Sequence, residues 1–281
     1  MIDERITSFA DFGSTTACRE ETLMFRRQAV ERVIATISER LSEPTSLLEM
    51  SRIAYISPFH FNRVFHQITS LPPAKFFGAL RLAAAKQLLL TTSMSVTEVC
   101  YEVGYNSLGT FTTRFTQLVG LSPHQFRRSS ERVTMASLET SCARFLERPR
   151  GNADQPCIKG VVTAPASVEG LILVGLFAGH IPQGQPAGGT LLARPGNYSI
   201  SGVSDGTYHL LAAVLPKSTD LLSYLLPERK SLYVGVGESP IIVRKGRAHG
   251  LADILLRPMR LTDPPLLISL PLLLTSSLSL R

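Results

Sequence analysis

The apolar residues of this chain follow two different spacings, and the change falls near the middle of the sequence. Between residues 24 and 130 they recur at the three- and four-residue intervals of amphipathic helices. From residue 157 onward they form short runs separated by Gly, Pro, Asn and Asp, as in β-strands joined by turns. The pattern predicts a multidomain α and β chain, with an all-α N-terminal part of about seven helices and an all-β sandwich after it.

We divide the chain into four segments on this basis. They are an N-terminal arm (1–23), a helical domain (24–130), a linker (131–156) and a β-rich domain (157–281). The polar run at 148–156 is rich in residues that break regular structure and is the expected join. A length of 281 residues also exceeds a single core of roughly 100–200 residues, which agrees with two domains.

The helical part contains an internal repeat. A shift of 50 residues pairs equivalent positions, namely Phe61 with Phe111, Phe65 with Phe115, Gln67 with Gln117, Leu71 with Leu121, Pro73 with Pro123 and Phe76 with Phe126. Upstream the shift is 49, so that Glu49 pairs with Glu98 and the second copy has one inserted residue. One structural unit is therefore used twice.

Each copy carries the start signals of two helices. Capping boxes are predicted at Ser46 with Glu49 and at Ser95 with Glu98, because each Ser and Glu can satisfy the other's free backbone amide. A second helix is expected near Ser57-Pro58 and near Ser107. Two helices joined by a short turn form the geometry that places the second helix in the major groove of DNA.

The turns of the two copies differ in one residue. Gly104 suits a positive φ, whereas Tyr55 at the equivalent position predicts strain of about 1 kcal/mol or a differently built turn. Ser51 and Cys100 are small, as a close helix crossing requires. Between the copies, residues 73–91 predict a long helix with an apolar face at Phe76, Leu80, Ala84 and Leu88.

The excess positive charge lies in the helical part. The whole chain has 29 Lys and Arg against 22 Asp and Glu, a net charge of +7 and a pI near 9.5. Residues 24–130 hold 12 of the basic and 6 of the acidic residues, a net of +6, which leaves +1 for the remaining 174 residues. A basic footprint confined to one module favours binding of nucleic acid by that module.

The helical part resembles the AraC/XylS family of bacterial transcription regulators over about 107 residues. The resemblance is carried, in order, by ISPFHFNRVF at 56–65, RLAAAKQLL at 81–89, VCYEVGY at 99–105 and GLSPHQFR at 120–127. It implies two helix-turn-helix units whose second helices enter adjacent segments of the major groove, joined by the long helix.

The resemblance also implies which residues read the bases. The family's base-reading positions fall on Phe59, Asn62 and Arg63 in the first unit and on Gly109, Thr110 and Thr113 in the second. Arg and Asn suit guanine and adenine edges, and an aromatic ring suits a thymine methyl. Thr113 stands where the family commonly has Arg and Gly109 offers no side chain, so the first unit is expected to dominate. Candidate phosphate contacts are Lys75, Arg81, Lys86, Arg114, Arg127 and Arg128.

The β-rich part resembles prealbumin-like β-sandwiches, such as those related to carboxypeptidase regulatory domains. The carriers are the stretches at 171–177, 196–200 and 205–214. The resemblance implies that the last two are adjacent strands, and Asp205-Gly206 is a hairpin signal. Further strands are expected at 232–236, 241–243 and 252–256, and a short helix at 220–226. The implied role is structural, adhesive or ligand-facing.

Neither part contains a motif for catalysis or metal binding. The cysteines, Cys18, Cys100, Cys142 and Cys157, lack ligand spacing and are typical of reduced thiols in a cytosolic protein. No nucleophile elbow is present. We therefore expect no enzyme, no cofactor and no metal. The start lacks a secretory signal and prolines interrupt the apolar run at 264–280, so we expect a cytoplasmic protein without membrane contact.

These observations lead to one hypothesis and one alternative. The hypothesis is a transcription regulator that binds double-stranded DNA sequence-specifically, with RNA polymerase as a further candidate partner. The C-terminal domain would sense a small-molecule effector or mediate self-association. The alternative is a protein-interaction or ligand-binding module with degenerate DNA recognition. Activator or repressor, target sequence, effector and oligomeric state stay open.

Overall fold

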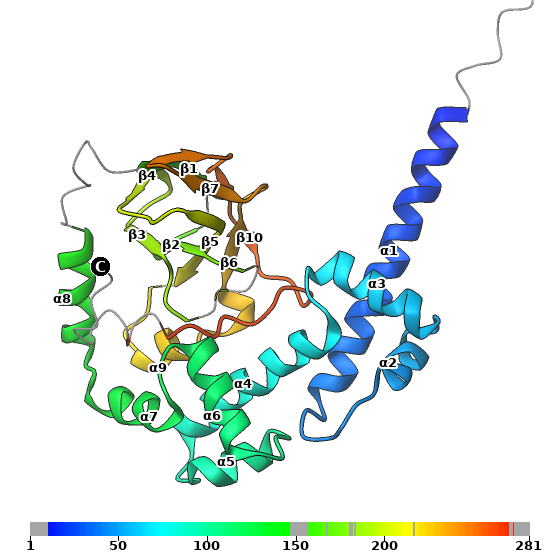
Figure 1. The fold of residues 1–281 in the computed structure, drawn as a ribbon, viewed down its shortest axis with the longest axis horizontal. Helices are drawn as coiled ribbons and strands as arrows, with labels where there is room; N and C mark the ends of the chain where they lie inside the picture. The colour runs from blue at the N-terminus through cyan, green and yellow to red at the C-terminus, as the bar shows by residue number, and fades with distance from the viewer. Residues whose placement is uncertain are drawn as a thin grey trace, which may run out of the picture. The chain divides into compact units, whose positions relative to one another are not determined.

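The computed structural model describes residues 11–146, 157–166, 168–179, 182, 184–215, 217–269 and 272, and only the backbone of 11–20, 144 and 145. The chain divides into two compact units, Met1–Phe77 and Gly78–Arg281. The division falls inside helix α4 (Pro73–Thr91), so each unit contains one of the two predicted helix-turn-helix copies. Figure 1 gives the order of the elements.

The first unit consists of α1 (Asp11–Ser38), α2 (Leu47–Ala54), α3 (Pro58–Thr69) and the start of α4. Both α2 and α3 contact α1. The long α1 begins inside the segment that we predicted as an N-terminal arm, 1–23. The pair α2 and α3 confirms the predicted helices of the first copy.

The second unit begins with the rest of α4 and continues through α5 (Val96–Glu102), α6 (Leu108–Val119), α7 (Pro123–Arg132) and α8 (Met135–Leu146). Within the described residues, seven helices therefore span 11–132, and they include the four helices of the two copies and the long helix between them that the sequence predicts. The eighth helix lies inside the predicted linker 131–156 and contacts a strand, β3 (Gly188–Leu192). The expected join at 148–156 lies outside the described residues.

The 50-residue repeat is a repeat of core packing. In the first copy, the ring of Phe65 lies 5.5 Å from the rings of Phe61 and Phe76. In the second, the ring of Phe115 lies 5.7 Å from those of Phe111 and Phe126. All six side chains are fully buried. The same three-ring cluster therefore holds the second helix of each copy against the helix that follows it.

The turns of the two copies have the same hydrogen bonds, although their residues differ. Tyr55 and Ile56 donate their backbone N–H groups to the carbonyls three and five residues earlier, and Gly104 and Tyr105 do the same 49 residues later. Tyr55 has φ 58° and Gly104 has φ 82°. The first turn is thus built like the second, and Tyr55 carries the predicted strain of the left-handed conformation.

One of the two predicted capping boxes is only half formed. Ser95 and Glu98 satisfy each other's backbone amides, as expected, and these bonds lower the pKa of the Glu98 carboxyl. Ser46 accepts the N–H of Glu49, but the carboxylate of Glu49 lies 2.7 Å from the guanidinium of Arg40. A charged donor is a stronger partner than a backbone amide, which explains the difference.

The predicted apolar face of α4 was wrong in part. Leu80, Ala84 and Leu88 are half-buried, whereas Leu82, Ala85 and Leu89 are fully buried. Few positions from Ala79 to Leu90 are exposed, because the later helices and the C-terminal segment, which includes Leu267 and Leu272, pack around this part of α4. A helix buried on several sides has no single apolar stripe for periodicity to identify.

The β-rich part of the second unit is a two-sheet sandwich, as predicted. The smaller sheet has the order β4 (Gly196–Ser201), β1 (Cys157–Thr163), β9 (Ile254–Leu255). The larger sheet has the order β10 (Arg257–Pro258), β6 (Tyr233–Val236), β5 (Gly206–Leu215), β2 (Leu171–Phe177), β3. Strand β7 (Ile241–Arg244) also belongs to it, and pairs with β5 and with β8 (Arg247–His249). The pairings are antiparallel except β1 with β9.

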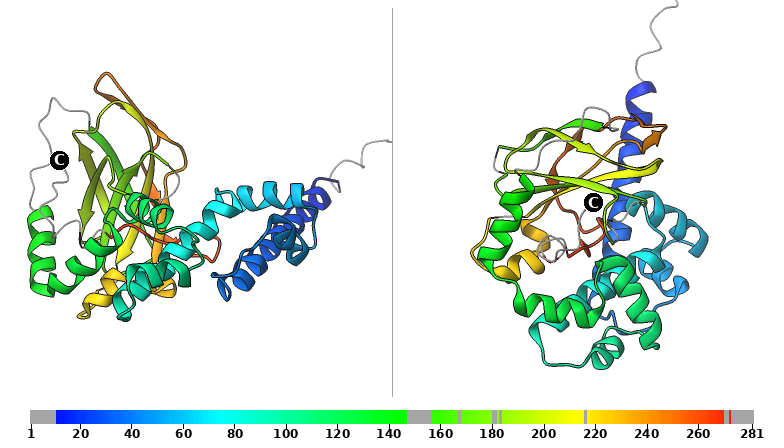
Figure 2. Two further views of the ribbon diagram at one scale, coloured as in Figure 1. Left: turned by 60° about the horizontal axis from the view of Figure 1, so that its bottom comes forward. Right: turned by 60° about the vertical axis from the view of Figure 1, so that its left-hand side comes forward.

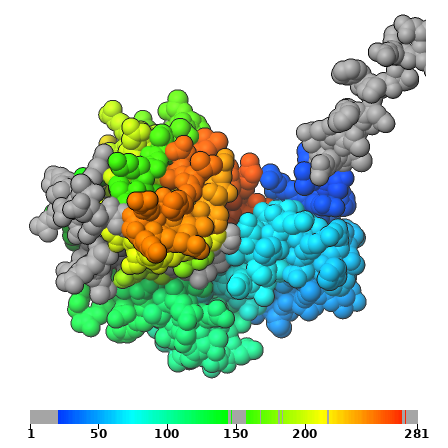
Figure 3. All heavy atoms as spheres, turned by 45° about the horizontal axis from the view of Figure 1, so that its top comes forward, coloured from blue at the N-terminus to red at the C-terminus, as the bar shows by residue number. Residues whose placement is uncertain are grey.

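One apolar core joins the two sheets. It contains Ile158 and Ile200 from the smaller sheet and Val174, Leu210 and Val243 from the larger one. Figure 2 shows the strands in two further views, and the later strands form much of the surface of this part on the face in Figure 3. The predicted short helix at 220–226 is also present, as α9 (Leu221–Leu225), with Asp220 as its N-cap.

The predicted pairing of 196–200 with 205–214 was wrong. The first stretch, β4, pairs with β1, whereas the second, β5, pairs with β2, β6 and β7. Between them, Gly202 has φ 73° and Val203 is buried in the sandwich core, so the chain crosses from one sheet to the other. The carboxylate of Asp205 accepts the N–H of Lys245, which stabilises the β7–β8 turn instead of a β4–β5 hairpin.

The C-terminal segment packs against the second helix-turn-helix copy. Leu267 and Leu272 are buried in the same core as Phe111 and Phe115. The backbone N–H of Ser269 donates to the carbonyl of Val119 at the end of α6. Helical and β-rich residues of the second unit therefore share a core.

Among the described residues, no helix combines the length and the apolar composition that crossing a bilayer requires.

The turn geometry predicts opposite effects for two glycine-to-alanine changes. Gly104→Ala is expected to destabilise the protein by about 1 kcal/mol, because alanine at a positive φ is strained. Gly78→Ala in α4 is the matched control and should stabilise by about 0.5–1 kcal/mol, since its added Cβ meets nothing within 4 Å. Urea unfolding followed by circular dichroism measures both. A stabilising Gly104→Ala would contradict the assigned turn.

Candidate nucleic-acid interface

Helix α3 buries one face and exposes the other. Phe61, Val64 and Phe65 are fully buried, and the predicted base readers Phe59, Asn62 and Arg63 are exposed. Phe59 is 84% exposed, which is unusual for a phenylalanine and places an aromatic ring in solvent. Because residues three and four apart share a helix face, the three readers form one stripe. Pro58 begins the helix at its first position, as expected.

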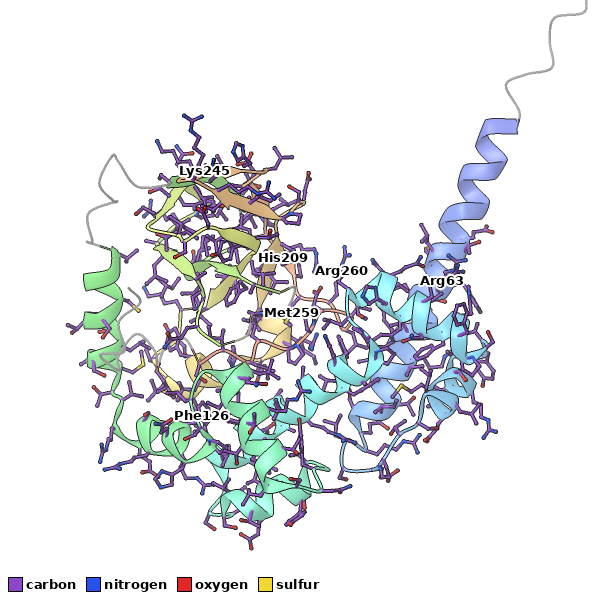
Figure 4. The ribbon with its side chains drawn as sticks, in the orientation of Figure 1. Arg63, Phe126, His209, Lys245, Met259 and Arg260 are labelled. Carbon is purple, nitrogen blue, oxygen red and sulfur yellow. The ribbon has the colours of Figure 1, made fainter. Side chains whose placement is uncertain are left out.

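Two histidines accompany the readers of α3, and the sequence reasoning missed both. A guanidinium nitrogen of Arg63 lies 3.2 Å from the Nδ1 of His60. His66 is exposed, three residues after Arg63 and seven after Phe59, so it extends the same stripe. This spacing was the signal that would have identified His66. Figure 4 marks Arg63 on α3.

Helix α6 presents an uncharged stripe at the equivalent place. Gly109, Thr110 and Thr113 are all exposed. The hydroxyl of Ser107 accepts the N–H of Thr110 and begins the helix, as predicted. A Cβ at Gly109 would meet only the Ser107 hydroxyl, at 3.9 Å, so a side chain would fit there. The two copies thus share a fold and differ in the groups that they expose.

Three of the six predicted phosphate contacts are exposed basic side chains. Lys75 lies in the first unit, and Arg114 and Arg128 lie in the second. Arg128 lines a shallow recess on α7 together with His124, Arg127, Glu131 and Arg132. His124 and Arg132 are therefore additional candidates for contact with an anion.

Two of the predicted phosphate contacts bind the protein's own backbone. Arg81 is half-buried and donates to the carbonyl of Gly104 at 3.1 Å, in the turn of the second copy. Arg127 is also half-buried and donates to the carbonyls of Leu89 and Met94, at 2.9 and 2.6 Å. These contacts hold the end of α4 against α7 and support the position of the second copy.

The remaining predicted phosphate contact, Lys86, is buried. Its side chain is 3% exposed, and its ammonium nitrogen lies 5.7 Å from the ring centroid of Phe126, which Figure 4 marks on α7. Burial lowers the pKa of the Lys86 ammonium to about 8. An ammonium in this position does not face a DNA surface, so we leave Lys86 out of the proposed interface.

The charges of Arg81 and Arg114 also act on a neighbouring tyrosine. Burial raises the pKa of the Tyr105 hydroxyl, and the two guanidinium groups act against that rise. The ring of Tyr105 packs on Phe111 at 5.4 Å. Tyr105 therefore remains an uncharged part of the turn, next to a positively charged surface.

In the part of the chain that the structure describes, no three His, Cys, Asp or Glu side chains come together as metal ligands.

Comparison with known proteins places the match on the two helix-turn-helix copies. The model of a family described as "Helix-turn-helix domain" matches residues 50–129. The transcriptional regulator GlxA of Rhizobium meliloti is 28% identical over 145 residues, 46% of this chain and 45% of GlxA. The transcriptional activator AarP of Providencia stuartii is 25% identical over 105 residues, 37% of this chain and 78% of AarP.

A solved structure is also similar to part of the chain. It is the DNA-binding domain of AdpA, described as a global transcriptional factor in complex with a target DNA. It is 28% identical, covers 37% of this chain and 93% of that chain, and has a TM-score of 0.36. The part of GlxA that this chain matches is less than half of GlxA's own length.

The buried ammonium predicts a pH-dependent cost to stability. The folded protein holds the Lys86 proton less tightly than the unfolded chain does. The charged ammonium therefore lowers the free energy of unfolding by its full amount below pH 8, and by less and less between about pH 8 and 10.5. Lys86→Met is therefore expected to stabilise the protein at pH 7 by about 2–3 kcal/mol. This gain should shrink at pH 9.5, as measured by urea unfolding.

Lys159→Met, on the exposed face of β1, is the matched control and should change stability little at either pH. A Lys86→Met gain of the same size at both pH values would show that the charge is not the cause.

Proposed function

We propose that this chain, whose residues 50–129 form an AraC-type helix-turn-helix domain, is a transcription regulator that binds double-stranded DNA sequence-specifically. The observation that carries the proposal is the exposed stripe of Phe59, Asn62 and Arg63, held outward by a fully buried aromatic face on the same helix. A second helix with an equivalent core, α6, presents a second stripe. Paired recognition helices are what two adjacent major-groove segments require.

The chemistry of the two stripes supports unequal roles. An exposed guanidinium can donate two hydrogen bonds to guanine O6 and N7, and an amide can pair with adenine, so α3 can discriminate between bases. The hydroxyl groups of Thr110 and Thr113 discriminate less between bases, because a hydroxyl can both donate and accept a hydrogen bond. We therefore assign most direct readout to α3, with Lys75, Arg114 and Arg128 as the phosphate contacts.

Further parts of the proposal rest on the protein's relatives and on the division of the sequence. AarP is named a transcriptional activator, which supports RNA polymerase as a partner. Residues 24–130 would bind DNA, and residues 157–281 would sense an effector or mediate self-association. A non-enzymatic role and a cytoplasmic location belong to the same proposal. One relative, AdaA of Bacillus subtilis, is named a bifunctional transcriptional activator and DNA repair enzyme, so an assay for DNA repair activity is the corresponding control.

The alternative is a protein-interaction module that has kept the fold and lost DNA recognition. The uncharged stripe of α6 favours it. Selection of bound sequences from a random duplex pool decides between the two functions. Recovery of one shared motif supports the regulator, and titration at two salt concentrations should then show steep salt dependence. Equal affinity for every duplex would support the alternative.

Arg63→Ala is expected to weaken binding to the selected site by about 1–3 kcal/mol and to relax one base preference, because the mutation removes a base-edge contact. Arg128→Ala should weaken binding to all sequences similarly, since a phosphate contact carries no sequence information. Arg247→Ala, an exposed arginine on β8, is the matched control. Competition titrations with matched and scrambled duplexes measure the three variants. An unchanged base preference in Arg63→Ala would reject its role as a reader.

Thr113→Arg is expected to strengthen binding and to add a base preference in the second half of the site. The position is exposed on α6, and arginine is a better helix former than threonine, so the gain should be about 1 kcal/mol without loss of folding. Thr116→Arg adds the same charge one turn later and should strengthen binding to all duplexes alike. Identical selected motifs for both variants would show that Thr113 does not face a base.

A further inference from the structure

The larger sheet of the sandwich is apolar on both faces. Val174 and Ala212 face the sandwich core, and the alternate residues Leu173, Leu211 and Ala213 face the opposite side. A sheet with one face in water alternates apolar and polar residues along each strand. The outer face of β2 and β5 therefore requires a covering layer. In the second unit α9 and the C-terminal segment lie beside this face.

The covering layer encloses a pocket on this outer face. The pocket has a cavity volume of about 70 Å³ and continues into open solvent. Its floor consists of β2, β3 and β5, and its other walls include Leu225 from α9 and Leu266 and Ile268 from the C-terminal segment. Small floor residues, Gly175 and Ala213, keep it open. A predominantly apolar lining with a few polar groups is typical of small-molecule sites.

Lys86 supplies the charge of this pocket. It is the one ionised side chain among the described residues that line it, and its side chain is 3% exposed. Among its described contacts, its ammonium lies over the ring of Phe126, and no carboxylate is paired with it. A buried charge without a counter-charge is costly to the folded protein. An anion in the pocket would offset that cost.

Two hydroxyl groups also line the pocket. Thr190 and Tyr224 line the pocket, and the hydroxyl oxygen of Tyr224 accepts the N–H of Ser218. The proton of the Tyr224 hydroxyl is therefore available to a further acceptor. One ammonium and two hydroxyls suit a single monoanionic group, whereas a phosphate dianion would require more donors in so apolar a site.

We propose that this pocket binds a small carboxylate with an apolar body. The carboxylate pairs with Lys86, and the apolar body lies on the outer face of β2, β3 and β5. A neutral apolar molecule would leave the ammonium uncompensated, and a cation would be repelled by it. The proposal names the site and the chemical class of the effector, and its regulatory consequence rests on the proposed function.

The site is connected to the DNA-binding part through its own residues. Lys86 belongs to α4, and Phe126 belongs to α7 and packs on Phe115 of α6. Leu225, a wall of the pocket, belongs to the same core cluster. A ligand that pairs with Lys86 would therefore stabilise the packing around α6.

Octanoate is the probe that tests the proposal, with octanol and octylammonium as the matched neutral and cationic probes. Binding to the full chain is measured without DNA, by calorimetry and by thermal shift. We expect saturable binding of octanoate with a raised melting temperature, at least tenfold weaker binding of octanol and no binding of octylammonium. Octanoate affinity should also fall above pH 8, as the ammonium loses its proton.

Lys86→Met should weaken octanoate binding at least tenfold while the chain stays folded, and Lys159→Met should leave it unchanged. Ala213→Leu, which narrows the floor, should weaken octanoate and octanol alike. Equal octanoate affinity in the wild type and Lys86→Met, or no saturable binding at millimolar octanoate, would overturn the proposal.

DNA binding is measured separately on the same wild-type preparation, so the two proposals fail independently. Octanoate binding without a selected DNA motif would retain the pocket and reject the regulator. A selected motif without octanoate binding would do the reverse.

Discussion

The packing of one phenylalanine between two others positions each recognition helix. Phe65 on α3 and Phe115 on α6 each contact a ring on their own helix and an equivalent ring on the next, and Phe65 also contacts Phe77. Burying such a ring stabilises the fold by about 1.5–3 kcal/mol. Because the rings occupy one face of each helix, the opposite face must point into solvent. The exposure of the predicted base readers is thus a consequence of how the core is filled.

This arrangement allowed the two copies to differ on the surface while keeping their core. The aromatic positions are the same in both, as are the hydrogen bonds of the turn. The exposed stripe carries Asn62 and Arg63 in one copy and Thr110 and Thr113 in the other. Exposed positions contribute little to stability, so they can change without loss of the fold. Even the turn tolerates Tyr55 in place of glycine at a modest energetic cost.

In the second unit, helical and β-rich residues depend on each other. The apolar outer face of β2 and β5 must be covered, and the second helix-turn-helix copy needs Leu267 and Leu272 to complete its core. The C-terminal segment lies against both. Lys86 stands in this shared region as a buried charge. Its position lowers stability, and a charge kept at such a cost is typical of a site that binds an opposite charge.

The sequence by itself determined the local elements. Caps, the 50-residue aromatic repeat and the run lengths of apolar residues predicted the helices of both copies and most strands, because each of these depends on residues near one another in the chain. The base-reading positions were implied by the resemblance to AraC/XylS regulators. The pairing of strands was harder to predict from the sequence. A hairpin signal at Asp205-Gly206 was outweighed by the burial of Val203, which carries the chain to the other sheet.

Only the tertiary structure decided which basic residues stay exposed and where the C-terminal segment lies. Lys75 and Lys86 look alike in the sequence, yet one is exposed and the other is buried over Phe126. The burial of Leu267 beside Phe115 joins residues about 150 positions apart. Such contacts depend on how preformed elements fill a common core, and local patterns carry no information about them.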